Sequence, residues 1–300
     1  MLKISLALNM LCNATIVKTN MPLYGGPLRK NVIQILVLST ILSLFAACSE
    51  KKDAAFDIKA KLDAKGCFSD YEIGGIVGGA KITTADPLSK KVVMLLMTKG
   101  DDLKICTGTP IASDVILTAA HCTHGYATGE IAIVFHTGIS CGSGFKSSTH
   151  SVGVRDIIVH EGYNKNELGS NDVSLIRIKS TIPSGYEVSE LYTGDKAGDK
   201  VTLLGYGLTS DKSGDSGVLR KVFKSKSQTF VQSHVMAITQ NDNKGICQGD
   251  SGGPVFFEVD GRMQVAGVNS LTYGGCHKAS IAMYVPYFKD WIQTKKAALR

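Results

Sequence analysis

The stretch Cys247-Gln248-Gly249-Asp250-Ser251-Gly252-Gly253-Pro254 decides how the rest of the chain is interpreted. It places a serine in a glycine-rich turn, and the residues that follow, Pro254 to Phe257, have the composition of a strand. Gly249 to Gly253 also match G-x-S-x-G, in which a nucleophilic serine stands between a strand and a helix and an acid and a histidine follow it. Here a strand follows, and only His277 lies after Ser251. This alternative is therefore disfavoured, and the partners of Ser251 are sought upstream.

Two upstream segments supply such partners. Leu117-Thr118-Ala119-Ala120-His121-Cys122 contains a histidine, and Asn171-Asp172-Val173-Ser174-Leu175-Ile176 contains an acid before an apolar run. A serine hydroxyl needs a base, and an imidazole titrates near neutral pH, so His121 suits that role. The base in turn needs a carboxylate that fixes its tautomer, for which Asp172 is the candidate. The other six histidines are interpreted as structural or exposed.

With Ile76-Val77-Gly78-Gly79, these motifs resemble the trypsin/chymotrypsin family of serine proteases, from Ile76 to the end of the chain. The resemblance implies a serine endopeptidase that works through an acyl-enzyme, with His121, Asp172 and Ser251 as its triad. It also implies an oxyanion hole made by the N–H groups of Gly249 and Ser251, and a hydrogen bond from Ser270 to the catalytic aspartate. Family members are made as zymogens, and the matching activation pair here is Ile76 and Asp250. Gly75 precedes the cut in place of Arg or Lys, so we expect an unidentified protease or the enzyme itself to make it.

Short β-rich runs separated by turn residues dominate the chain after Ile76 and predict an all-β fold. The resemblance specifies two six-stranded antiparallel β-barrels, an N-barrel over about 76–190 and a C-barrel over about 191–285. A C-terminal helix is predicted over 286–297, because Pro286 suits a first turn and Lys295 and Lys296 suit a last turn. The predicted strands are Val92–Met97, Val115–Ala119, Ile131–Phe135, Ile157–His160, Val173–Ile178, Val201–Leu204, Val218–Phe223, Val255–Glu258, Met263–Val268 and Ala282–Val285.

The resemblance also indicates a primary specificity pocket. Gly245 stands where trypsins have the aspartate that binds Arg or Lys, and Ile246 follows it. Thr272 and Ala282 replace wall glycines, which predicts a short apolar slot for small or medium aliphatic residues. The strand Ser270-Leu271-Thr272 is expected to pair with the substrate backbone. A chymotrypsin-like preference for Leu, Met or Phe is the alternative specificity.

Eight cysteines fit an exported protein with disulfides. Cys12 belongs to the leader, and the resemblance pairs Cys106 with Cys122 and Cys247 with Cys276. Cys67 and Cys141 remain; their pairing would keep the propeptide attached after activation, and two free thiols are the alternative.

The first 47 residues predict a signal peptide, since basic residues precede an uncharged apolar run from Val32 to Ala47. Leu44-Phe45-Ala46-Ala47-Cys48 resembles the lipobox of bacterial lipoproteins, which predicts lipidation of Cys48. An ordinary cleaved signal is the alternative, and translation from Met21 is a second open point. Residues 48–75 are interpreted as a solvated tether and propeptide, and residues 76–300 as the protease domain. The predicted location is the bacterial cell envelope, with a lipid anchor in the outer membrane, or secretion.

The formal charge of +7 first suggests a partner such as nucleic acid. The leader accounts for +4, the tether for −1 and the domain for +4, so the domain is only mildly basic and no nucleic-acid partner is predicted. We expect a monomer that acts on proteins or peptides and needs no cofactor and no metal. A catalytically silent binding module on the same fold is the alternative function.

Overall fold

The computed structural model describes residues 76–138, 150–167, 169–194, 197–213 and 216–299. All of them belong to one compact unit of the chain, Asp53–Arg300. The leader, the tether, Cys48, Cys67 and Cys141 lie outside the described residues, so the signal peptide, lipidation and third disulfide stay predictions. Within the described ranges, no helix is both long and apolar enough to cross a membrane.

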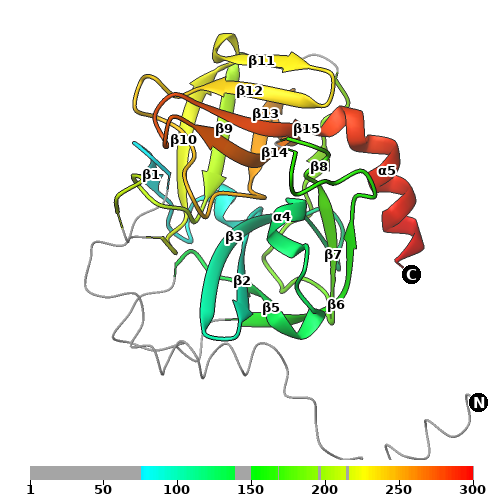
Figure 1. The fold of residues 1–300 in the computed structure, drawn as a ribbon. Coiled ribbons are helices and arrows are strands. Elements are labelled where there is room, and N and C mark those ends of the chain that lie inside the picture. The colour runs from blue at the N-terminus through cyan, green and yellow to red at the C-terminus, as the bar shows by residue number, and fades with distance from the viewer. Residues whose placement is uncertain (1–75, 139–149, 168, 195–196, 214–215, 300) are drawn as a thin grey trace, which may run out of the picture. The chain divides into compact units, whose positions relative to one another are not determined.

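The N-terminal half forms a closed six-stranded antiparallel barrel with the strand order β2-β3-β4-β7-β6-β5 (Figure 1). Val93 to Thr98 of β2 are all buried, since both faces of the strand are covered, which accounts for the unbroken apolar run in the sequence. The first of the two predicted barrels is therefore confirmed. Its strands are β2 (Val93–Lys99), β3 (Asp102–Pro110), β4 (Val115–Thr118), β5 (Ile131–Phe135), β6 (His150–Val159) and β7 (Ser174–Ile178).

The C-terminal half forms a nine-stranded sheet, ordered β1-β10-β9-β13-β14-β15-β12-β11, with β8 parallel to β14. Among the described residues its outer strands β1 and β11 do not pair with each other, so a second closed barrel is not confirmed. The 3₁₀ turn η3 (Lys226–Gln228), capped by Ser225, separates β10 from β11. These two strands do not form a hairpin, since β10 pairs with β9 and β11 pairs with β12. The strands are β1 (Ala80–Lys81), β8 (Glu190–Leu191), β9 (Lys200–Gly205), β10 (Arg220–Ser225), β11 (Thr229–Gln232), β12 (Val235–Thr239), β13 (Pro254–Val259), β14 (Arg262–Tyr273) and β15 (Ala279–Tyr284).

One long helix, α5 (Val285–Ala298), ends the described chain and confirms the predicted C-terminal helix. Pro286 lies in its first turn, and two lysines lie in its last turn. Its buried side chains are Val285, Phe288 and Ile292, and it lies along the side of the molecule in Figure 1. The remaining short helices are α4 (Ala120–Thr123), η1 (Pro87–Lys90) and η2 (Thr128–Glu130).

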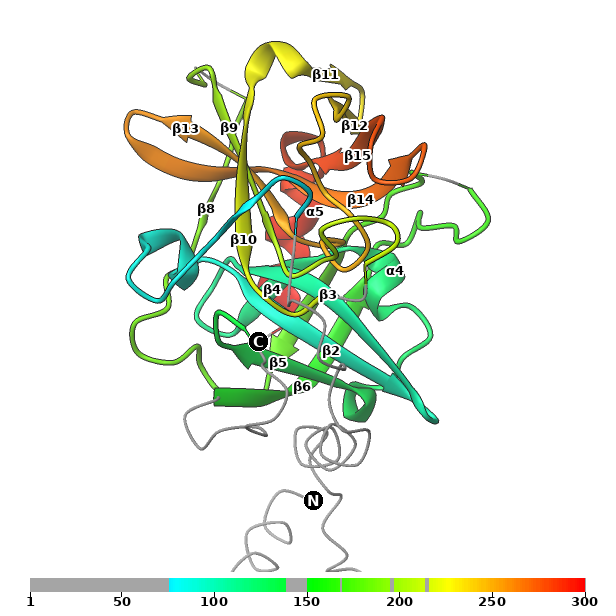
Figure 2. The same ribbon diagram turned by 90° about the vertical axis from the view of Figure 1, so that its left-hand side faces the viewer.

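The two halves meet where the serine turn contacts the barrel. The Thr107 N–H on β3 donates to the Ser251 carbonyl at 2.8 Å. Figure 2, turned by 90°, shows β3 and α4 of the barrel beneath the sheet that carries β14. The junction between the halves therefore brings together residues that are more than a hundred positions apart.

Candidate active site

His121 lies on α4, a single helical turn that is anchored from two sides. Cys122, its neighbour, forms a disulfide with Cys106 on β3, as predicted. The Thr123 hydroxyl donates to the hydroxyl of Ser174 at 2.8 Å. A helix of four residues would not hold its shape alone, so these tertiary bonds fix the histidine.

Asp172 is buried, with 4% of its surface exposed, and it accepts three hydrogen bonds. The His121 backbone N–H donates to Oδ1 at 2.8 Å, and His121 Nδ1 lies 2.7 Å from Oδ2. The Ser270 hydroxyl donates to Oδ2 at 2.6 Å. A carboxylate can only accept, so His121 carries its proton on Nδ1 and leaves Nε2 free. Asn171 precedes the aspartate with a φ of 45°, a conformation that asparagine tolerates better than most residues.

The environment of Asp172 keeps the carboxyl ionised. Burial raises its pKa, but hydrogen bonds from His121 and Ser270, with the charge of His121, outweigh burial and hold the pKa below its ordinary value. The aspartate is therefore a negative charge fixed beside the imidazole at neutral pH.

Ser270 reaches Asp172 because β14 carries a β-bulge. In the ladder with β15, Asn269 pairs with Ala282 and Leu271 pairs with Ile281, so Ser270 is the extra residue. A bulge turns the extra side chain out of the regular alternation. The predicted contact between Ser270 and the aspartate is therefore present, and this irregularity of the strand creates it.

Ser251 lies in a tight loop that only glycine allows at position 249. Gly249 has a φ of +96°, and a Cβ there would come 2.8 Å from the Gly207 Cα. The Thr107 hydroxyl donates to the Gly249 carbonyl at 2.9 Å and accepts from the Tyr206 N–H at 3.2 Å. Within the described residues, the N–H groups of Gly249 and Ser251 donate to no acceptor. Both N–H groups are therefore available to a ligand.

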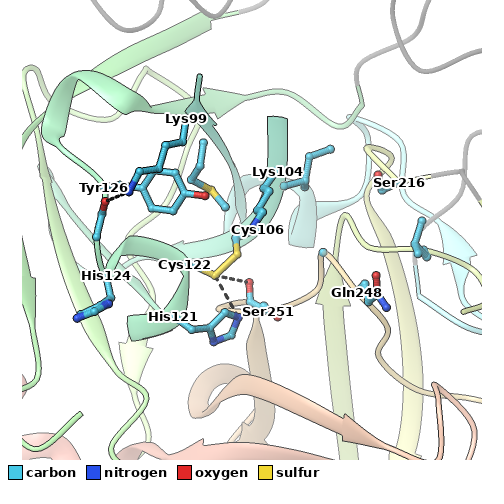
Figure 3. A pocket seen from close by; sticks show the side chains of 15 residues that line it. Lys99, Lys104, Cys106, His121, Cys122, His124, Tyr126, Ser216, Gln248 and Ser251 are labelled. Atoms are coloured by element: carbon cyan, nitrogen blue, oxygen red, sulfur yellow. Dashed lines mark hydrogen bonds between the residues drawn. A yellow bond between two sulfur atoms is a disulfide. The ribbon is translucent and has the colours of Figure 1, made fainter. Parts of the chain in front are cut away.

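His121 and Ser251 border one cleft of about 640 Å³ (Figure 3). The Cys122 sulfur lies 3.7 Å from His121 Nε2 and 3.8 Å from the Ser251 carbonyl oxygen. Among the described contacts, no hydrogen bond joins the side chains of His121 and Ser251. Cys106, His121 and Cys122 bring potential ligand atoms within 4.8 Å, but the sulfurs are joined in the disulfide, so this cluster is not a metal site.

Gly245 and Ile246, the predicted base of the pocket, surround the side chain of Gln240. A Cβ on Gly245 would come 2.1 Å from Gln240 Cδ. Gln240 Nε2 donates to the carbonyls of Ile246 and Cys276, and Oε1 accepts from the Ile246 N–H at 2.9 Å. Sequence reasoning missed Gln240, since no local pattern shows that its amide joins the pocket base to the Cys247–Cys276 disulfide, which is present as predicted.

The predicted pocket walls lie on two paired strands. Ala282 is fully buried and stands opposite Asn269, while Thr272 and Leu271 are half-buried farther along β14. Asn269 is also fully buried, and neither amide atom has a hydrogen-bond partner among the described residues. An unpartnered buried amide is costly, so it is a candidate contact for substrate or water.

The acid upstream of the pocket, Asp242, is engaged elsewhere. Its Oδ1 lies 2.6 Å from Nζ of Lys224, whose side chain is fully buried. The ammonium also donates to the Lys244 carbonyl at 3.1 Å. This carboxylate therefore neutralises a buried lysine and does not act as a pocket base for a cationic substrate.

Ile76 and Asp250 are both fully buried. The Asp250 oxygens accept N–H groups from Gly207 and Cys247 at 2.7 and 2.8 Å, but no cation of the described residues pairs with them. Burial raises the pKa of Asp250 to about 7 against these hydrogen bonds. Val77 exchanges two backbone hydrogen bonds with Gly245, so the start of the described chain is attached to the pocket base.

Several known proteins are similar to this chain in sequence. The sequence model of the trypsin family matches residues 76–292. Brachyurin of Leptuca pugilator is 33% identical over 217 residues, which cover 65% of this chain and 89% of that protein. Trypsin Blo t 3 of Blomia tropicalis is 30% identical over 290 residues, 88% of this chain and 98% of that protein. Serine protease SP24D of Anopheles gambiae is 28% identical and covers 73% of this chain and 80% of its own length. The chain therefore belongs to the trypsin family of serine proteases.

Proposed function

We propose that this chain is a serine endopeptidase whose triad is His121, Asp172 and Ser251. The arrangement of His121 carries the proposal: a buried ionised carboxylate holds its Nδ1 proton, and its ring borders the same cleft as Ser251. A metal-independent acyl transfer needs such a base, a nucleophile and an oxyanion site in one place.

In the acylation step, Ser251 Oγ attacks the carbonyl carbon of the scissile bond and His121 Nε2 takes the hydroxyl proton. Asp172 stabilises the imidazolium that forms. When the tetrahedral intermediate collapses, the C–N bond breaks, and His121 gives the proton to the leaving amine. Water then attacks the ester carbonyl while His121 takes a proton from the water. The bond to Ser251 Oγ breaks, His121 returns the proton to Oγ, and the acid product leaves.

The N–H groups of Gly249 and Ser251 are proposed to bind the oxyanion. Neither has an acceptor among the described residues, so neither must break a bond to turn toward the substrate. Removing one such donor in comparable enzymes costs about 10²–10³ in kcat, so the conformation of this loop controls much of the rate.

The specificity that we propose is for small or medium apolar residues before the scissile bond. Gly245 and Ile246 provide no charge at the base, and Ala282 and Thr272 shorten the slot. One misfit methylene costs about 1–3 kcal/mol, so selectivity among aliphatic residues should be modest.

We further propose a zymogen that is exported and tethered through Cys48. A cut between Gly75 and Ile76 would free an ammonium to pair with Asp250, a buried carboxylate to which no cation is paired within the described part of the chain. The lipid anchor and the Cys67–Cys141 disulfide rest on the sequence alone.

A serine-reactive fluorophosphonate tests the proposal. Full-length protein and protein cut at Gly75–Ile76 are labelled, with Ser251→Ala as the control for site. We expect label on Ser251 mainly in the cut protein, and hydrolysis of Ala and Val peptides ahead of Arg and Lys peptides. A cut, folded protein that takes no label would favour the silent binding module.

A further inference from the structure

We propose that the cleft beside His121 is a subsite for an acidic side chain on the leaving-group side of the scissile bond, with Lys104 as its charged residue. The inference rests on the proposed function and specifies the substrate. Its basis is the composition of the cleft shown in Figure 3.

The cleft lies on the leaving-group side of Ser251. Its lining comes from β2, β3, α4 and the loops at Leu208 and Gln248. None comes from Ser270–Thr272 of β14, the strand proposed to pair with the acyl part of the substrate. We therefore assign this cleft to the residues that follow the scissile bond.

The charge of the cleft is positive. Lys99 and Lys104 line it, and none of its lining residues is an aspartate or a glutamate. Burial, Glu130 and Asp102 together raise the pKa of Tyr126, which lines the cleft, so these two carboxylates lie near its Tyr126 end although neither is part of the lining. The charged side chains that line the cleft itself are all basic, which favours a ligand of the opposite sign at the Lys104 end.

Of the two lysines, Lys104 is the free one. Lys99 Nζ donates to the Gly125 carbonyl at 2.9 Å and lies 5.8 Å from the centre of the Tyr126 ring. Lys104 is exposed, and its ammonium forms no hydrogen bond or ion pair with any described residue. It can therefore bind a carboxylate without breaking an existing interaction.

Position along the substrate follows from the strand. Lys104 is two residues before Cys106 on β3, or about 7 Å, and Cys106 is bonded to Cys122, whose sulfur touches the Ser251 carbonyl. Since an extended peptide advances about 3.3 Å per residue, we place the acidic side chain at the second or third residue after the scissile bond.

Quenched fluorescent peptides that differ only at these two positions test the proposal on the cut enzyme. Each peptide carries Glu, Gln or Lys there, and kcat/KM is measured for wild type, Lys104→Gln and Lys104→Glu. We expect the wild type to favour Glu over Gln by roughly two- to fivefold at low salt, and less in 0.5 M salt, as for an exposed ion pair. Lys104→Gln should abolish this preference, and Lys104→Glu should transfer it to the Lys peptide.

Lys226 provides the matched control, because it is exposed on η3 and absent from the cleft. Lys226→Gln should keep the wild-type preference. Equal rates for Glu and Gln peptides in the wild type, or a Glu preference that survives in Lys104→Gln, would overturn the subsite. If a separate sample of the same folded, cut enzyme takes fluorophosphonate on Ser251 but the unlabelled enzyme cleaves none of the peptides, the result would instead count against the endopeptidase itself.

Discussion

Thr107, on β3 of the barrel, fixes the backbone of the loop that carries Ser251. Its hydroxyl donates to the Gly249 carbonyl and accepts from Tyr206, and its N–H holds the Ser251 carbonyl. The carbonyl and the N–H of Gly249 lie on either side of one α-carbon. By holding the carbonyl, the Thr107 hydroxyl helps to orient the Gly249 N–H, which is proposed to bind the oxyanion. Thr107 is therefore a positioning residue that does not itself touch the substrate.

Replacing Thr107 by valine keeps the shape and removes the hydroxyl. We expect kcat to fall about 3- to 30-fold with KM little changed, because a lost hydrogen bond of about 1–2 kcal/mol affects a group used in the transition state. Steady-state kinetics on an Ala peptide provides the measurement. Thr107→Ser, which keeps the hydroxyl, should restore most of the rate. A valine variant that loses melting temperature but no kcat would assign Thr107 a purely structural role.

Ser270 supplies the third hydrogen bond to Asp172, and its removal has a predictable sign. Without this donor, the pKa of Asp172 rises from its lowered value, so the carboxylate becomes protonated at a higher pH. Ser270→Ala should therefore raise the pKa of Asp172 in an NMR titration of its carboxyl carbon and reduce the plateau of kcat/KM by roughly 3- to 10-fold. Ser280→Ala, a buried serine whose hydroxyl has no partner among the described residues, is the control. An unchanged titration of Asp172 would contradict the assignment.

The contacts of α5 show how one element is fixed to the barrel. Trp291 Nε1 donates to the Glu161 carboxylate at 2.6 Å, and Lys295 forms an ion pair with the same carboxylate. The Trp291 and Phe288 rings pack on His160, which precedes that glutamate. The loop that leads to Asp172 is thus held by the last helix of the chain.

Glu161 makes this attachment dependent on pH. Hydrogen bonds from Lys295 and Trp291 lower its pKa to about 2, so its contribution is present above the ordinary pKa of 4.5 and disappears as pH falls toward 2. Glu161→Gln should lower the melting temperature by about 1–3 °C at pH 7 and by less near pH 2. The side chain is more than half exposed, which keeps the effect small. Glu167→Gln, an exposed neighbour, should leave the melting curve unchanged at every pH, and an equal loss in both variants would contradict the role of Glu161.

The sequence predicted elements best where one periodicity is unbroken. Ile131–Phe135 was matched residue for residue by β5, because an uninterrupted apolar run forms a strand covered on both faces. β3 was missed, since its first half is polar and exposed and its second half contains Gly108. α5 followed from Pro286 and the terminal lysines, which act locally. Strand pairing between distant segments has no such local signal, so the bulge at Ser270 and the open edge at β11 could not be read from the pattern.

The same distinction applies to the site. His121, Asp172 and Ser251 each stand in a distinctive local motif, and the two disulfides followed from the resemblance. Gln240, Asn269 and Thr107 act through partners that only the assembled halves provide, and no motif marks them. Prediction from the sequence therefore named the proposed reacting groups and Ser270, but not the side chains that only the assembled halves bring to them.

Folding of the whole molecule leaves Asp250 with an unfavourable charge that activation could relieve. Burial raises its pKa to about 7 from 3.8, so in the folded uncut chain ionising it requires free energy. The contribution of protonated Asp250 to the free energy of unfolding is therefore fully present below about pH 4, and it is lost as pH rises through 7. Three pKa units correspond to roughly 4 kcal/mol of difference between the two protonation states.

Melting temperatures between pH 4 and 8 test this linkage in the Ser251→Ala background, where the chain cannot cut itself. We expect the uncut protein to lose stability toward pH 8, and Asp250→Asn to remove most of that slope. Cutting at Gly75–Ile76 by an added protease should raise the melting temperature at pH 8, since the new ammonium would neutralise Asp250. If the uncut protein and the Asp250→Asn variant melt in parallel across this range, Asp250 is not the group whose charge opposes the uncut fold.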